Sequence, residues 1–369
     1  MQTSVIRNIQ EAANNPVYCK NLLQEIQQIL DGETFRFMEV CGTHTTAIYQ
    51  SGLSSLLPAN IIHLSGPGCP VCVTDDSEIA IFLDLARKEE IILATFGDLL
   101  RVPGADGFSL KHAQAAGADI RIVYSSLEAA QIAKANPQKE VVFLGAGFET
   151  TAPLTAAVIM QASQLKLSNF SAFSMHKLVP PALAALLDDP GHNMDAFLLP
   201  GHVATITGLS PFKFLAANYR LPATVGGFEP VDILLGLRSL AKMFREKKPE
   251  VINAYPRAVV ETGNPKALSL LKKVFEPCDA RWRGLGIIPK SGLKIRDKFK
   301  DFDSQKKFSL TLPIIKKKSA CKCGLVLKGQ ISPPQCPLFG KKCTPATPVG
   351  PCMVSTEGSC AARYKYGEI

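Results

Sequence analysis

Short apolar or β-branched runs recur along the first 245 residues, and segments with helical spacing of apolar positions separate them. The apolar runs predict eight strands, at residues 35–40, 61–65, 91–95, 120–124, 141–144, 170–174, 196–199 and 223–225. Helices are expected between them, for example over residues 75–88 and 182–187. Strands that alternate with helices indicate right-handed βαβ units and parallel sheets covered on both faces.

The eight predicted strands divide into two sets of four, each about 100 residues long, and the loops that follow the strands correspond in character. We therefore predict an α/β protein with two similar Rossmann-like domains, at residues 1–130 and 131–245, whose four-stranded parallel sheets face a central cleft. A single eight-stranded sheet is the alternative. Ligands of such sheets bind at the carboxyl ends of the strands, where the polar loops of this chain lie.

After residue 245 the alternation stops and the composition changes. Residues 246–369 contain 24 Lys and Arg against 10 Asp and Glu, a net charge of +14, and 7 of the 11 cysteines. This basic, cysteine-rich segment predicts a separate C-terminal domain. Because its last part has few apolar residues, a bound metal is the expected source of its stability.

Composition excludes several classes of protein. With 46% hydrophobic and 20% charged residues the chain is not disordered. No apolar run approaches the roughly 18 residues of a membrane span, and residues 1–15 lack the apolar core of a signal peptide. A cytoplasmic location is expected, where cysteines more often bind metals or do redox work than form structural disulfides. Nucleic-acid binding is not expected, because the basic segment has few aromatic residues and its lysines are spread out.

The chain beyond residue 320 carries six cysteines: Cys321, Cys323, Cys336, Cys343, Cys352 and Cys360. Cys-Pro at 336–337 and Gly-Pro-Cys at 350–352 are typical of iron–sulfur ligand loops. Four thiolates would suit a [4Fe–4S] cluster. A zinc ion held by four thiolates is the alternative.

Cys69 and Cys72 have the spacing of a dithiol–disulfide redox pair and follow a predicted strand and two glycines. A helix is expected to begin just after them, with Thr74 as its N-cap. A loop at the sheet edge should expose the pair to partners. The alternative is half of a zinc site, although residues 1–130 contain no second such pair to complete it.

Cys41 ends the first predicted strand, and His44 follows in the first turn of the next helix. A thiolate and an imidazole placed together can bind a transition metal or activate a nucleophile. A cysteine at the end of a buried strand is also common as simple packing. The loop with Cys69 and Cys72 leaves the next strand at the same sheet edge, which favours a functional role.

The loop at residues 145–150 resembles a dinucleotide-binding turn but has Thr150 where that turn needs its third glycine. NAD binding is therefore not expected. Glu149 places a carboxylate at a strand end, either as a catalytic group facing the cleft or as a cap of the next helix. His176, Lys177 and His202 also follow predicted strand ends.

Taken together, these motifs resemble a known family. The runs Cys-Gly-Thr-His-Thr at 41–45, Gly-Pro-Gly-Cys-Pro-Val-Cys at 66–72 and Gly-Phe-Glu-Thr-Thr at 147–151, with the cysteines of residues 321–360, resemble the HypD family of [NiFe]-hydrogenase maturation factors. The resemblance extends over about residues 30–366. It implies two α/β domains and a third domain with a [4Fe–4S] cluster.

The resemblance also implies a function and partners. HypD proteins form a stable complex with HypC, a small chaperone with an N-terminal cysteine, and this complex holds the iron on which the Fe(CN)2CO group is assembled. HypE, a transient partner, delivers cyanide as a thiocyanate on its C-terminal cysteine. Release of cyanide takes two electrons, which a cluster and dithiols would relay. The hydrogenase large-subunit precursor would be reached indirectly.

Finally, the resemblance implies roles for individual residues. Cys41 would hold the transient iron with the aid of His44, Cys69 and Cys72 would cycle as a redox disulfide, and Glu149 would belong to the catalytic group. The expected cluster ligands are Cys321, Cys336, Cys343 and Cys360. This leaves Cys323 and Cys352 as a second redox pair; the rival ligand set is Cys323, Cys336, Cys343 and Cys352. An iron–sulfur dithiol–disulfide reductase is the alternative function, and whether the chain turns over as an enzyme stays open.

Overall fold

The structure, a computed structural model, describes residues 15–315 and 320–367. Residues 1–14, where no signal peptide is expected, and the lysines at 316–318 of the basic segment lie outside the described residues. None of the helices in the described ranges combines the length and the apolar character needed to cross a bilayer.

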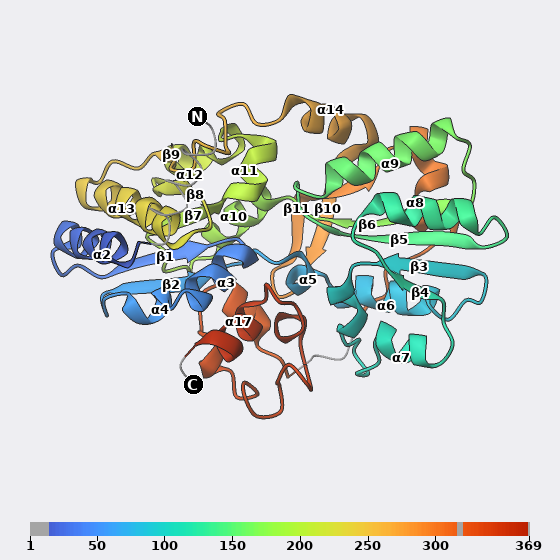
Figure 1. Ribbon diagram of the computed structural model, residues 1–369, viewed down its shortest axis with the longest axis horizontal. Helices are drawn as coiled ribbons and strands as arrows, with labels where there is room; N and C mark the ends of the chain where they lie inside the picture. Colours follow the sequence, from blue (N-terminus) through green and yellow to red (C-terminus); the bar gives the residue numbers. More distant parts are fainter. Residues whose placement is uncertain (1–14, 316–319, 368–369) are drawn as a thin grey trace.

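Two parallel sheets form the body of the protein (Figure 1). The five-stranded sheet has the order β2 (Ile61–Ser65), β1 (Phe35–Glu39), β7 (Ala196–Pro200), β8 (Ala223–Gly226) and β9 (Val251–Asn253). The four-stranded sheet has the order β4 (Ile120–Ile122), β3 (Ile91–Thr95), β5 (Glu140–Gly147) and β6 (Phe170–His176). The prediction of an α/β protein with parallel sheets is confirmed.

All eight predicted strands are present, each within three residues of its expected ends. The helix expected at residues 75–88 is α6 (Asp76–Leu85), and the helix expected at 182–187 is α10 (Val179–Leu187). The predicted N-cap Thr74 is wrong by one residue. Asp75 caps α6 instead, accepting a hydrogen bond from the Ser77 N–H, while the Glu78 carboxylate accepts one from the Asp75 N–H.

The predicted grouping of the strands is wrong. The first four strands do not share a sheet, because β1 and β2 pair with β7 to β9, whereas β3 and β4 pair with β5 and β6. The chain passes to the second sheet after β2 and returns after β6, so the expected boundaries at residues 130 and 245 do not coincide with the division between the sheets. Apolar periodicity defines each strand, but it does not determine which strand pairs with which.

Helices cover the sheets and divide the core into three parts. An apolar cluster under α2 (Pro16–Leu30) and α13 (Pro230–Glu246) packs on the five-stranded sheet, and another under α8 (Ser126–Ala135) and α9 (Ala152–Gln164) packs on the four-stranded sheet. A third cluster joins residues of both sheets, including Met38 and Phe197 from one and Val142 and Leu144 from the other. The remaining helices of the body are α3 (Gly42–Gln50), α4 (Leu53–Leu56), α5 (Pro70–Val73), η1 (Gly97–Arg101), α7 (Leu110–Ala115), α11 (Gly201–Thr207), η2 (Ser210–Phe212) and α12 (Phe214–Tyr219).

An antiparallel hairpin, β10 (Phe275–Trp282) and β11 (Gly286–Ile295), follows α14 (Pro265–Val274) and was not predicted. Its prolines at 277 and 289 hide the strand pattern. The hairpin joins the four-stranded sheet to the segment after β2, because Leu178, just after β6, donates its N–H to the Ser291 carbonyl and the Arg283 N–H donates to the Val73 carbonyl (3.0 Å). After η3 (Asp297–Phe302) and α15 (Ser304–Lys307) the chain leaves this region.

The C-terminal segment, residues 320–367, lies against α3 and α5, below the two sheets in Figure 1. Its regular elements are short: α16 (Cys323–Leu327), η4 (Pro333–Gln335), η5 (Pro351–Met353) and α17 (Ser359–Tyr366). Side-chain contacts hold it to the body, among them Thr43 donating to Glu357 and Ser355 donating to Asp98. The cysteine-rich segment is therefore packed beside the loops that follow β1 and β2.

Candidate functional site

Cys41 lies two residues after β1, at the N-cap of α3, and is 7% exposed. The buried carboxylate of Glu39 accepts hydrogen bonds from the Cys41 N–H (2.9 Å) and from the Thr45 hydroxyl (2.5 Å), so it holds the turn in place. Burial raises the pKa of the Cys41 thiol to about 12, and the nearby carboxylates of Glu357 and Glu39 act in the same direction. The free thiol is therefore protonated at neutral pH, and a bound cation would be needed to stabilise the thiolate.

The loop after β2 packs directly on Cys41. The Gly42 N–H donates to the Gly68 carbonyl (2.9 Å), and a Cβ atom at Gly68 would lie 2.1 Å from the Cys41 nitrogen. Only a glycine permits this approach. The approach brings the loop that carries Cys69 against the end of β1.

Cys69 and Cys72 lie at the start of α5, which Figure 1 shows at the junction of the two sheets. Their sulfur atoms are 2.6 Å apart as free thiols, and the Cys72 N–H donates to the Cys69 sulfur (3.2 Å). The expectation that this loop exposes the pair is wrong, because the two residues are 3% and 0% exposed. The C-terminal segment and the shared core cover them, which local sequence does not reveal.

Three further thiols continue from Cys72 into the C-terminal segment. The Cys72 side chain lies beside that of Cys352, Cys352 beside Cys323, and Cys323 beside Cys321. Cys323 and Cys352 are thus in contact, and their redox pairing stays a prediction. The result is an unbroken line of sulfur atoms from the junction of the sheets to the C-terminal segment, which we call the thiol line (Cys69, Cys72, Cys352, Cys323 and Cys321).

Arg283 is a residue of this site that sequence analysis missed. It is 7% exposed, pairs with Asp76 and donates from Nε to the Thr74 carbonyl (3.2 Å). Its charge lowers the pKa of the Cys321 and Cys323 thiols, but burial raises the pKa of both by more. No motif marks this arginine, since it reaches the thiols only through the hairpin.

The four predicted cluster ligands gather at the end of the thiol line. Burial raises the pKa of Cys360, and the nearness of Cys321, Cys323, Cys343 and Cys336 adds to the effect. The Cys343 sulfur accepts a hydrogen bond from the Val349 N–H (3.4 Å), as cluster-bound thiolates commonly do. A Cβ atom at Gly350 would lie 2.5 Å from the Cys321 sulfur, so a glycine leaves the space that this sulfur occupies.

Within residues 15–315 and 320–367, no three His, Cys, Asp or Glu side chains converge closely enough to hold a single metal ion. Thiolates that hold a [4Fe–4S] cluster bind different irons, so their sulfur atoms stand farther apart than the ligands of one zinc ion. The all-thiol surroundings, the N–H donor and the space at Gly350 fit a [4Fe–4S] cluster.

His44 is fully buried in α3, and its Nε2 lies 2.8 Å from the Gly227 carbonyl. Burial lowers the pKa of the imidazole to about 4. The ring is therefore neutral at pH 7 and Nε2–H donates to the carbonyl, which leaves the lone pair on Nδ1. Nδ1 is buried and has no hydrogen-bond partner. A second histidine, His202, stacks on Phe228 (4.0 Å between ring centroids), and the Phe228 ring also contacts His44 (4.7 Å).

Glu149 is 3% exposed, and burial raises the pKa of its carboxyl to about 7. Its Oε1 accepts a hydrogen bond from the Val179 N–H (3.0 Å), at the start of α10. The carboxyl therefore caps a helix, but not the next one, α9. Its Oε2 is buried without a partner, so the acid can hold or release a proton near neutral pH.

His176 and Lys177 do not join the cysteines. Lys177 is buried in an ion pair with Glu78 (2.6 Å), and burial lowers the pKa of His176 to about 3. Both line a cavity of about 300 Å³ beside the hairpin. Their positions indicate a structural role in joining β6 to α6.

The fold and the site define the class of protein: an α/β body of two parallel sheets, with a buried dithiol at their junction that connects to a cysteine-rich C-terminal segment. Comparison with known proteins gives the family. The sequence model HypD, described as the Hydrogenase formation hypA family, matches residues 17–367. The chain therefore belongs to the HypD family of hydrogenase maturation factors.

Relatives match over most of their length. The chain is 44% identical to Hydrogenase maturation factor HypD of Rhizobium leguminosarum bv. viciae over 358 residues, which are 95% of this chain and 93% of the relative. It is 45% identical to HypD2 of Bradyrhizobium diazoefficiens over 342 residues (91% and 90%) and 44% identical to HypD of Escherichia coli K12 over 334 residues (90% and 89%).

Proposed function

We propose that this protein is a scaffold and redox relay on which the Fe(CN)2CO group of [NiFe]-hydrogenase is assembled in the cytoplasm, with HypC as a stable partner and HypE as the transient cyanide donor. The observation that carries the proposal is the thiol line, because it connects the region of Cys41 to the predicted cluster ligands without a break. The finished group would pass to the hydrogenase large-subunit precursor indirectly.

The iron under assembly is the substrate, and Cys41 is its anchor in this proposal. A thiolate suits the low-spin ferrous iron that cyanide and carbonyl ligands require. The thiol's high pKa means that it loses its proton only when the metal binds. His44 offers the Nδ1 lone pair in the same helical turn, and the N-terminal cysteine of HypC would supply a second thiolate.

Cys69 and Cys72 supply the two electrons. When a thiocyanate R–S–C≡N accepts two electrons and one proton, its S–C bond breaks and it yields R–SH and cyanide. The dithiol loses two electrons and two protons and becomes a disulfide; one proton goes to the R–S group and the other is released. Cys352 and Cys323 then reduce the Cys69–Cys72 disulfide by thiol–disulfide exchange.

Cys321, Cys336, Cys343 and Cys360 would hold the [4Fe–4S] cluster in a third domain. The cluster, when bound, supplies one-electron chemistry beside the second thiol pair. The Val349 N–H would stabilise the Cys343 thiolate, and Gly350 leaves room for the Cys321 sulfur.

An infrared spectrum of the anaerobically copurified complex with HypC tests this proposal. We expect cyanide and carbonyl stretching bands in the complex of the wild-type chain, and their loss in Cys41→Ala with the visible cluster absorption unchanged. Bands of full strength in the Cys41→Ala complex would remove Cys41 as the anchor. Absence of such bands from the wild-type complex would contradict the scaffold function. A general dithiol–disulfide reductase is less favoured, since the buried Cys69–Cys72 pair cannot reach a folded protein substrate.

A further inference from the structure

The positive charge of the C-terminal segment has no part in the function proposed above. Residues 320–367 contain six Lys and Arg and one carboxylate, that of Glu357. The Glu357 carboxylate faces inward and accepts a hydrogen bond from the Thr43 hydroxyl (2.8 Å). The outer surface of the segment therefore carries charge of one sign, from the exposed side chains of Lys322, Lys341, Lys342 and Lys365.

Two of these lysines lie in the turn between two predicted cluster ligands. Lys341 and Lys342 directly precede Cys343, and Cys336 lies at the other end of the turn. Hydrogen bonds from the N–H groups of Lys341 (3.2 Å) and Cys343 (2.9 Å) to the Leu338 carbonyl close the turn. Cys336 and Cys343, at the ends of the turn, are 9% and 7% exposed, and the other two predicted ligands, Cys321 and Cys360, are partly exposed.

The turn is also fixed to the rest of the segment. The Phe339 ring meets Tyr364 of α17 edge-on (6.0 Å between centroids), and α17 carries Cys360 and Lys365. Among the described residues, none of the four exposed lysines pairs with a carboxylate. Their charge is thus available to a partner.

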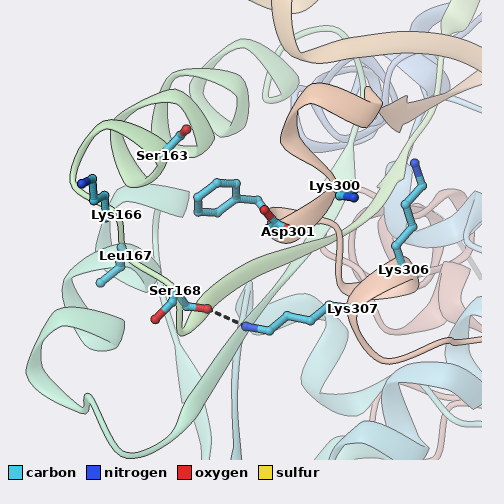
Figure 2. A pocket seen from close by; sticks show the side chains of 9 residues that line it. Ser163, Lys166, Leu167, Ser168, Lys300, Asp301, Lys306 and Lys307 are labelled. Carbon is cyan, nitrogen blue, oxygen red and sulfur yellow. Dashed lines mark hydrogen bonds between the residues drawn. The ribbon is translucent and has the colours of Figure 1, made fainter.

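A second basic surface gives a contrast. Lys166, Lys300, Lys306 and Lys307 line a pocket of about 510 Å³ between the end of α9 and the segment of η3 and α15 (Figure 2). There Lys307 pairs with Glu140 and donates to the Ser168 carbonyl (2.6 Å), and Lys306 pairs with Asp297. Figure 1 shows α9 and α17 on opposite sides of the molecule, so this pocket is remote from the cysteines.

We propose that the turn at residues 336–343, with Lys341 and Lys342 next to Cys343, is the docking surface for an acidic one-electron carrier protein. Complementary charge speeds and orients the encounter of such proteins. Because electron transfer weakens steeply with distance, the carrier should dock beside the predicted cluster ligands, two of which bound this turn. The inference rests on the proposed redox function and adds the class of the electron donor.

The electrons balance as follows. Two reduced carrier molecules each release one electron and leave oxidised. Two electrons and two protons from solvent convert the Cys69–Cys72 disulfide into two thiols. The same lysines would attract nucleic acid, but the neighbouring aromatic rings of Phe339 and Tyr364 pack against each other and are not free to stack on bases.

Calorimetric titration of the anaerobically purified full chain tests the docking surface. The probes are an acidic plant-type [2Fe–2S] ferredoxin and an acidic flavodoxin, each oxidised, at about 50 mM and about 300 mM salt. We expect at least one probe to bind, with affinity that falls with salt. The double variant Lys341→Glu/Lys342→Glu should weaken it about tenfold or more at low salt. The matched variant Lys166→Glu/Lys300→Glu, in the remote pocket, should change it less than about twofold.

Equal weakening in both variants would overturn the proposal, since it would show only general charge attraction. Failure of both carriers to bind the wild-type chain would also overturn it, as would tighter binding of a single-stranded DNA 20-mer that depends on the same two lysines. None of these results affects the cyanide and carbonyl bands of the HypC complex, so failure of the docking surface is separable from failure of the proposed function.

Discussion

Burial holds several side chains of the site in protonation states that water would not favour. The Cys41 thiol has a pKa of about 12, the His44 imidazole a pKa of about 4 and the Glu149 carboxyl a pKa of about 7, each shifted chiefly by loss of solvent. At pH 7 the neutral forms of Cys41 and His44 are therefore the stable ones without a bound partner, whereas Glu149 is close to half ionised. Groups with such shifted pKa values are suited to bind a cation, as Cys41 could, or to donate a proton, as Glu149 could, at a defined step.

Replacing Glu149 with Gln tests the ionisation of this buried acid. Its pKa is higher in the folded state than in the unfolded chain, so its contribution to stability is complete below pH 4.5 and is lost as pH rises through about 7. Glu149→Gln removes this loss. Relative to wild type, its free energy of unfolding should therefore increase by roughly 2–3 kcal/mol between pH 5 and pH 8, measured by urea unfolding. The exposed Glu89→Gln should show no such pH-dependent difference; a flat profile in both variants would contradict the assignment.

Two substitutions of His44 test which ring nitrogen is needed to hold the iron. In His44→Gln the side-chain amide can still donate to the Gly227 carbonyl but has no equivalent of the Nδ1 lone pair, whereas His44→Ala loses both. We expect both variants to lose the iron–cyanide infrared bands, and only His44→Ala to lose stability, by about 1–3 kcal/mol. If His44→Gln retains the bands at full strength, the histidine serves only to orient the turn.

At the scale of elements, the important contact is between the end of β1 and the loop after β2. These strands are neighbours in the five-stranded sheet, so their carboxyl ends meet, and Gly68 allows the loop to pack on the Cys41 backbone. α5 then begins at the junction of the sheets and points Cys72 toward Cys352. The two cysteine motifs are therefore positioned by one strand pairing and one glycine.

Gly68→Ala should disrupt this contact. The added Cβ would lie 2.1 Å from the Cys41 nitrogen, a backbone atom that cannot rotate away. We expect a loss of about 1–3 kcal/mol in the free energy of unfolding, together with loss of iron in the HypC complex. Gly97→Ala is the control, because its Cβ would meet no atom closer than 3.8 Å. Equal thermal stability of the two variants would show that the loop moves aside at no cost.

At the scale of the whole molecule, four segments far apart in sequence build one site. The loops after β1 and β2, the hairpin with Arg283 and the C-terminal segment meet at the junction of the two sheets. The apolar cluster that joins both sheets includes Cys69, Cys72, Cys323 and Cys352, so the thiol line is part of the packed core. Its thiols are shielded from solvent and from outside thiols, which favours exchange among themselves.

Single substitutions in the C-terminal segment test the assignment of ligands. The Cys321 sulfur occupies the room that Gly350 leaves by having no side chain, whereas Cys323 lies beside both Cys321 and Cys352. We expect Cys321→Ser to lose most of the iron and the visible absorption, and Cys323→Ser to keep four irons per chain but fail in maturation. Iron counting on anaerobic protein decides. Loss of the cluster in Cys323→Ser, with Cys321→Ser intact, would favour the rival set of Cys323, Cys336, Cys343 and Cys352.

The strands, most of their bounds and the cysteine motifs could be predicted from the local sequence alone. Runs such as 61–65 and 91–95 are apolar enough to require burial wherever they pair, so their existence follows without a partner. The hairpin at 275–295 escaped prediction because its prolines mask the alternation.

Only the tertiary structure decided how these parts combine. The pairing of β1 with β7, the burial of Cys69 and Cys72, and the place of Arg283 and Glu39 beside the cysteines all depend on contacts between residues distant in sequence. The pattern of apolar residues along the chain indicates which residues are stabilised by burial. It does not indicate which part of the protein buries them. The site lies where several such surfaces meet, so its chemistry could be expected from the cysteines, whereas its geometry depended on the packing of the whole chain.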